Sequence, residues 1–84
     1  MKIKVKQFED KKNQFQIETD DGFYFQSYNS IICFCPKKGK TQLDKNYYDY
    51  SKTTSRYRNA FLGCNSKELQ HKIDSGEYEL VNLN

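Results

Sequence analysis

The middle of the chain combines aromatic rings with positive charges in one short segment. The candidate binding residues of this segment are Tyr47, Tyr48, Tyr50, Lys52, Arg56 and Arg58. Tyrosine rings stack on unpaired bases while lysine and arginine neutralise phosphates, and tyrosine and arginine are also frequent anchors of protein–protein interfaces. The segment therefore predicts a binding surface, and its chemistry leaves both kinds of partner open.

Positive charge is concentrated around this segment. Residues 37–58 hold seven basic side chains against two acidic ones, a net charge of +5, whereas the whole chain carries +3. This sign argues against an acidic mimic of DNA. Periodicity does not decide whether the tyrosines of residues 47–50 lie in the core or at the surface. The arginines have an alternative interpretation as solvated residues on an exposed helix face that binds no partner.

The soft metal ligands of the chain are Cys33, Cys35, Cys64 and His71, the inventory of a Cys₃His zinc site. The first two cysteines are at i and i+2 of an expected strand, so their side chains point to one face about 7 Å apart. Thiolates that share a tetrahedral zinc ion lie closer together than that. We therefore predict no metal and interpret the cysteines as small buried hydrophobic residues.

Gly39-Lys40-Thr41 resembles the end of a phosphate-binding loop. That loop needs a second glycine five residues upstream, where this chain has Phe34, and it needs a helix directly afterwards. We interpret these residues as a basic hairpin turn. With one histidine, no clustered carboxylate pair and no glycine loop, the sequence predicts neither an enzyme nor a cofactor.

Alternation of apolar and polar residues predicts half-buried strands in the first half of the chain. The predicted strands span residues 2–6, 14–18, 23–28, 31–35 and 41–43. Gly22 supplies the positive φ that a tight hairpin favours, whereas Asn29-Ser30 predicts a bulge or bend within extended structure. The row of Lys2, Lys4 and Lys6 is typical of an edge strand that is guarded against aggregation.

The second half changes to helical spacing. Tyr57, Ala60 and Phe61 fall at i, i+3 and i+4 and predict a helix within residues 53–62, which Gly63 would cap. A second short helix follows: its start resembles a capping box formed by Asn65 and Glu68, its apolar side consists of Leu69 and Ile73, and it ends at Gly76.

A closing strand from Tyr78 completes the order of elements. The whole chain, residues 1–84, is therefore predicted to be a single α+β domain with an antiparallel sheet of about four to five strands and two short helices packed on it. We expect burial of Tyr57, Phe61, Leu69 and Ile73, and exposure of Lys52, Arg56 and Lys67.

Composition favours a small folded protein. Leu, Ile, Val and Phe account for only 18 of 84 residues, but seven tyrosines and six phenylalanines supply bulky apolar area. The longest apolar run, Ile31–Cys35, is far shorter than the about 20 residues of a membrane span. The lysine-rich start lacks the apolar stretch of a signal peptide, and three cysteines suit a reducing compartment. These features predict a cytoplasmic protein without membrane contact.

Four stretches carry a resemblance that extends over nearly the whole chain. They are FQSYNSII (25–32), LD followed by YYDYS (43–51), TTSRYRNAFLG (53–63) and KIDSGEY with the final LN (72–84). Together they resemble a family of small proteins of unknown function found in bacteriophages and low-GC bacterial mobile elements. The resembling proteins often have Trp where this chain has Tyr48. The resemblance implies no catalytic residue, and it implies that the protein acts by binding, often to inhibit a host enzyme or a defence system.

The sequence thus predicts a non-enzymatic binding protein, in a host-takeover or anti-defence role, whose partner is a host or defence protein. The alternative is a nucleic-acid-binding domain that uses the basic, tyrosine-rich residues 37–58. No small-molecule substrate is indicated.

Overall fold

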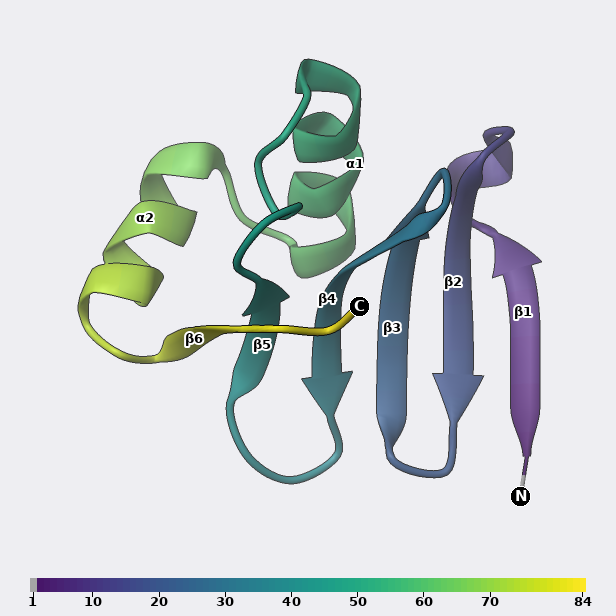
Figure 1. The fold of residues 1–84 in the computed structure, drawn as a ribbon, viewed down its shortest axis with the longest axis horizontal. Helices are drawn as coiled ribbons and strands as arrows, with labels where there is room; N and C mark the ends of the chain where they lie inside the picture. Colours follow the sequence, from purple (N-terminus) through teal and green to yellow (C-terminus); the bar gives the residue numbers. More distant parts are fainter. Residues whose placement is uncertain (1) are drawn as a thin grey trace.

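The computed structural model describes residues 2–84, which form a sheet and two α-helices (Figure 1). The strands are β1 (Ile3–Gln7), β2 (Gln14–Thr19), β3 (Gly22–Ser27), β4 (Ser30–Pro36), β5 (Thr41–Asp44) and β6 (Tyr78–Val81). The helices are a short 3-10 helix η1 (Phe8–Asp10), α1 (Lys52–Leu62) and α2 (Ser66–Asp74). The α+β class predicted from the sequence is confirmed.

The sheet differs from the prediction in strand number and direction. It has six strands, not four to five, and they follow one another in chain order. Neighbouring strands from β1 to β5 are antiparallel, but β5 and β6 are parallel. The reason is the connection: both helices lie between β5 and β6, and such a crossover returns the chain to the end of the sheet where β5 began.

Two tight turns shape the antiparallel part. Gly22 has φ of +150° and a side-chain carbon there would lie 2.2 Å from the carbonyl oxygen of Cys35, so only glycine fits the predicted hairpin between β2 and β3. The predicted bulge or bend at Asn29-Ser30 is wrong. The chain reverses there, because Tyr28 adopts φ of +55° without a glycine and opens a second hairpin between β3 and β4.

Both helices begin as their sequences indicate, but α2 ends at Asp74, two residues before the predicted Gly76. Ser51 caps α1 by accepting a hydrogen bond from the Thr54 N–H at 3.1 Å, and Gly63 ends that helix with φ of +73°. The predicted capping box of α2 is present: Asn65 accepts from the Glu68 N–H at 2.8 Å, and Glu68 accepts in return from the Asn65 N–H at 3.0 Å.

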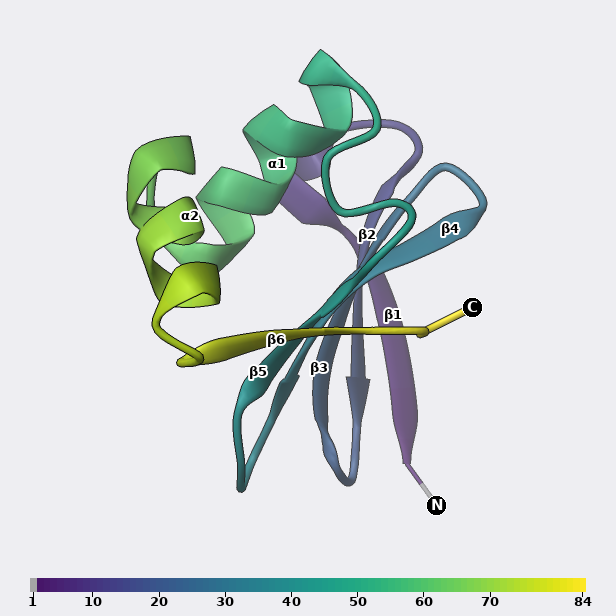
Figure 2. The same ribbon diagram turned by 60° about the vertical axis from the view of Figure 1, so that its left-hand side comes forward.

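The core lies between the helices and one face of the sheet. Phe25, Cys33 and Leu43 are neighbours in register on β3, β4 and β5, and all three are fully buried. Phe61 of α1 stacks on Phe25 with ring centroids 5.5 Å apart, and Leu69 of α2 is buried against the same cluster. Figure 2 shows both helices on the same side of the sheet.

Most predictions of burial are confirmed. Tyr57, Phe61 and Ile73 pack against the core and are partly buried, while Lys52, Arg56 and Lys67 are exposed. The prediction that the first strand is half-buried is wrong. Strand β1 is exposed along its whole length, because α1 and α2 do not reach this end of the sheet.

Candidate binding site

The tyrosine loop, residues 46–51, connects β5 to α1 at the upper end of the sheet in Figure 1. Its start is fixed by Asp44, which is fully buried at the end of β5. One carboxylate oxygen accepts from the N–H groups of Asn46 at 3.0 Å and Tyr47 at 2.9 Å, and the other accepts from the Leu83 N–H at 2.7 Å. The carboxylate therefore ties the loop to the C-terminal segment.

Burial by itself raises the pKa of the Asp44 carboxyl, but the N–H groups of Leu83, Asn46 and Tyr47 donate to the charged form. The hydrogen bonds outweigh the burial, and the pKa of Asp44 lies below its ordinary value. Asp44 is thus an ionised anchor at neutral pH.

Arg58 of α1 fixes the middle of the loop. Its side chain is only 1% exposed, and its guanidinium donates to the carbonyl oxygen of Tyr48 and, at 3.2 Å, to the carboxylate of Asp49. The other side of the guanidinium donates to Asn59 at 2.9 Å and to Ser66 at 3.3 Å. One buried side chain thereby joins the tyrosine loop, α1 and the first residue of α2.

Arg58 corrects the sequence interpretation, which placed it among the partner-binding residues. Its charge is satisfied inside the protein and is not available to a partner. Helical spacing carries a signal for this: Thr54, Arg58, Phe61 and Leu62 are at i, i+4, i+7 and i+8, which is one face of a helix. Asp44 also has a signal, because an aspartate at the start of a turn accepts from the N–H groups two and three residues on.

Two of the three predicted tyrosines are exposed. Tyr47 is 38% and Tyr50 is 45% exposed, and their rings meet edge to face with centroids 5.7 Å apart. The ring of Tyr48 points inward and packs against the core. The tyrosine loop therefore presents one aromatic pair to the solvent and keeps its third ring as an anchor.

One basic residue of α1, Lys52, lies beside this aromatic pair. Tyr50 and Lys52 line the same shallow hollow, together with Asp49, Ser51 and Ser55. Arg56 is exposed one turn further along α1, with its guanidinium 5.8 Å from the ring centroid of Tyr57. The exposed binding candidates are therefore Tyr47, Tyr50, Lys52 and Arg56.

The remaining lysines of the basic segment lie elsewhere. Lys37, Lys38 and Lys40 belong to the turn between β4 and β5, whereas the tyrosine loop follows the opposite end of β5. The four residues of β5 span roughly 14 Å at the usual rise of a strand. The net charge of residues 37–58 is thus divided between two ends of the molecule.

The cysteines are in or beside the core. Burial raises the pKa of the Cys33 thiol well above its ordinary value, and burial also raises the pKa values of Cys35 and Cys64. The thiols are therefore protonated at neutral pH and weakly nucleophilic. Within residues 2–84, no group of three or more His, Cys, Asp or Glu side chains is placed to hold a metal ion.

In the described part of the chain, neither α-helix is long and apolar enough to cross a membrane. The model of a protein family whose description reads "Family of unknown function (DUF8033)" matches residues 2–77, which extend from β1 through α2 and leave out β6. No curated protein and no solved structure matches the chain.

Proposed function

The chain belongs to this family of unknown function, and we propose that it is a small non-enzymatic binding protein whose tyrosine loop engages a partner protein. The observation that carries the proposal is the pair of exposed rings, Tyr47 and Tyr50, on a loop held by two buried charged side chains. Tyrosines supply large contact area at interfaces, and Lys52 and Arg56 add charge at the margin.

The loop is ordered before any partner arrives. Asp44 fixes its first two N–H groups, and Arg58 fixes the carbonyl oxygen of Tyr48 and the carboxylate of Asp49. Immobilising a loop and its side chains on binding costs free energy, so a loop that is already held in place retains more of its contact energy as affinity.

The proposal includes the biological setting implied by the sequence resemblance. In that setting the protein is encoded by a bacteriophage or a mobile element, acts in the cytoplasm of the host cell, and binds a host or defence protein in order to inhibit it. The lack of any catalytic constellation in the sequence and the protonated state of the three thiols support binding in preference to catalysis.

Nucleic acid is the alternative partner, supported by the hollow that Tyr50 and Lys52 line together. A ring beside a cation is the arrangement that single-stranded nucleic acid uses for stacking and phosphate contact. The position of the lysines of residues 37–40 at the other end of β5 counts against it, because they do not extend this small basic patch.

A photo-crosslinking residue at Tyr47 or Tyr50 tests the protein-binding proposal in a lysate of infected cells treated with nuclease. We expect one host protein to be crosslinked, and we expect its capture to be lost in Tyr47→Ala and Tyr50→Ala. Tyr28 is the matched control, since it is 46% exposed but lies in the turn between β3 and β4. Tyr28→Asn suits the positive φ there and should leave capture unchanged.

Salt dependence separates the two kinds of partner. If nucleic acid is bound, the affinity of the protein for it must fall steeply between about 50 and 200 mM salt. The double variant Lys52→Ala with Arg56→Ala must then reduce the slope of affinity against salt concentration. A protein partner held by the tyrosines should show a weak dependence. Tight binding of single-stranded DNA with the steep slope would replace the protein partner by nucleic acid.

A further inference from the structure

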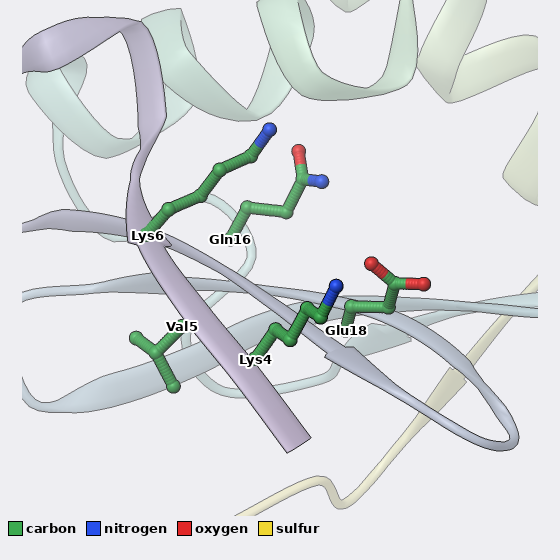
Figure 3. Close-up of a pocket in the computed structure, with 5 residues that line it drawn as sticks. All are labelled: Lys4, Val5, Lys6, Gln16 and Glu18. Atoms are coloured by element: carbon green, nitrogen blue, oxygen red, sulfur yellow. The ribbon is translucent and has the colours of Figure 1, made fainter. Parts of the chain in front are cut away.

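In the first hairpin of the sheet, formed by β1 and β2, polar side chains lie on the face that the helices cover and apolar side chains lie on the opposite face. Figure 3 shows the side chains of Lys4, Lys6, Gln16 and Glu18 projecting from one face of β1 and β2, while Val5 projects from the other. The first four share the face of the sheet that carries Phe25 and the helices, because Gln16 pairs in register with Phe25. The apolar residues of this hairpin therefore face away from the core.

These apolar residues continue across the sheet as a row. Val5, Ile17, Tyr24 and Phe34 are successive partners in register on β1, β2, β3 and β4. Tyr24 and Phe34 stack with ring centroids 4.2 Å apart. None of the four belongs to the core cluster beneath the helices. We call this side of the sheet the open face; its apolar members are Ile3, Val5, Phe15, Ile17, Tyr24 and Phe34.

The open face has the composition of a buried surface. An antiparallel sheet with helices on one face ordinarily presents polar residues on the other, but no residue that β1 to β4 place on this face is charged, in a chain with 30% charged residues. Ile3 is 58% and Val5 is 61% exposed. Contiguous apolar surface of this kind marks an interaction site.

We propose that the open face is a dimer interface, on which a second copy of this chain packs with its own open face. An uncharged face fits an uncharged occupant, because a charged partner would lose water without gaining an opposite charge. The same face of a second copy meets this condition, and two sheets packed face to face form a sandwich of the usual kind.

The charges at the rim of the open face are also self-complementary. Asp20 and Asp21 in the turn between β2 and β3 lie beside Lys37 and Lys38 in the turn after β4, and the four residues border one hollow with Tyr24 and Phe34. The two turns are joined by a hydrogen bond from the Lys37 N–H to the carbonyl oxygen of Asp21 at 2.9 Å. A two-fold axis that runs along the strands between these turns brings the acidic turn of each copy to the basic turn of the other. The same axis lays β3 of one copy over β4 of its partner and β2 over β5, so the stacked rings of Tyr24 and Phe34 lie at the centre and β1 lies at the margin.

Pairing of two copies through the free edge of β1 is the competing arrangement, and the lysine row opposes it. In a two-fold antiparallel pair centred on any residue of β1, residues of the same parity are opposite each other, so lysines meet lysines. The face, unlike the edge, brings two copies together without repulsion.

The area of the open face sets the expected affinity of the dimer. Four strands at about 4.8 Å spacing, each with about six residues at roughly 3.4 Å rise, cover a plane of about 400 Å² in each copy. The two faces together come to about 800 Å², below the about 1,000 Å² that a stable specific interface exceeds. We therefore expect a weak, reversible dimer that forms towards submillimolar concentration.

Sedimentation equilibrium from low-micromolar to submillimolar concentration tests the proposal. The wild-type chain should change from monomer to dimer over this range. Ile17→Lys, and separately Tyr24→Lys at the centre of the face, should weaken the dimer at least tenfold, while circular dichroism shows that the variants stay folded. Gln16→Lys is the matched control, because it introduces the same side chain next to Ile17 on the opposite face, and it should dimerise like the wild type.

Charge reversal at the rim tests the symmetry. A chain with Asp20→Lys and Asp21→Lys, and a chain with Lys37→Glu and Lys38→Glu, should each associate more weakly alone and should recover the wild-type affinity when mixed. A wild-type chain that stays monomeric at submillimolar concentration overturns the proposal. So does a dimer that Ile17→Lys and Tyr24→Lys leave intact, or a mixture of the two rim variants that fails to associate.

Discussion

Replacement of Arg58 by alanine should destabilise the protein strongly, although charged residues on a helix are ordinarily tolerant. Removal of the guanidinium leaves the carbonyl oxygen of Tyr48 without its donor, and a buried unsatisfied acceptor costs about 1–3 kcal/mol. The contact with Asp49 adds little, because that carboxylate is 62% exposed and stays hydrated when the arginine is gone. Loss of the buried aliphatic stem adds a comparable packing penalty.

The sum is about 3 kcal/mol in the free energy of unfolding. A chain of this size has about 4–13 kcal/mol in total, and the loss corresponds to a fall of about 12–24 °C in Tm. Urea and thermal unfolding followed by circular dichroism measure both quantities. Arg58→Lys keeps the charge and the stem but cannot reach the same set of acceptors, so it should fall between the wild type and Arg58→Ala.

Arg56→Ala is the control, since Arg56 is exposed two positions earlier on the same helix. It should change the free energy of unfolding by less than about 0.5 kcal/mol. If Arg58→Ala is as mild as Arg56→Ala, the guanidinium does not hold the loop, and the preorganised tyrosine surface on which the proposed function rests has no basis.

Three further perturbations follow from the core and its buried groups. Phe61→Ala should cost about 3 kcal/mol, the low end for such a truncation because the ring is partly buried, and a loss below about 1 kcal/mol in urea unfolding would contradict the packing. The pKa of Asp44 is depressed in the folded state, so its contribution to the free energy of unfolding is present above about pH 5 and is lost as the pH falls through the pKa of the folded protein. Asp44→Asn should flatten the acid side of a plot of the free energy of unfolding against pH, and an unchanged plot would exclude this role. The pKa of Cys33 is raised by burial, so iodoacetamide should label Cys33 more slowly than Cys64 in the native state; equal rates by mass spectrometry would contradict its burial.

Local patterns predicted the elements of this fold well, because caps, turns and alternation are written in neighbouring residues. The capping box at Asn65, the cap at Gly63 and the hairpin at Gly22 each depend on the type of residue within three positions of the feature. The hairpin at Tyr28 was missed since tyrosine rarely adopts a positive φ. The parallel pairing of β5 with β6 depends on how the helices carry the chain back, and no local pattern encodes that path.

Alternation in β1 separates two faces but does not say which of them the helices cover. The apolar set Ile3 and Val5 was expected inside, and the structure turns it outward. Arg58 shows the opposite failure: its charge suggested the surface, but its helical position, in line with Thr54 and Phe61, determines that it is buried. In both cases the residue type and the position disagreed, and only the packed structure shows which one decides.

The two proposed surfaces lie where they can be used at the same time. The tyrosine loop follows the upper end of β5 in Figure 1, whereas the turns that carry Asp21 and Lys37 lie at the lower end of the sheet. A dimer formed through the open faces therefore leaves both tyrosine loops exposed, and it presents two copies of the Tyr47–Tyr50 pair. Two linked sites bind a dimeric or immobilised partner with a higher effective affinity than one site does, without any new contact. Ile17→Lys should consequently weaken binding to a surface densely coated with the partner while leaving the affinity for the soluble, monovalent partner unchanged, and an equal loss in both formats would show that the open face itself contacts the partner.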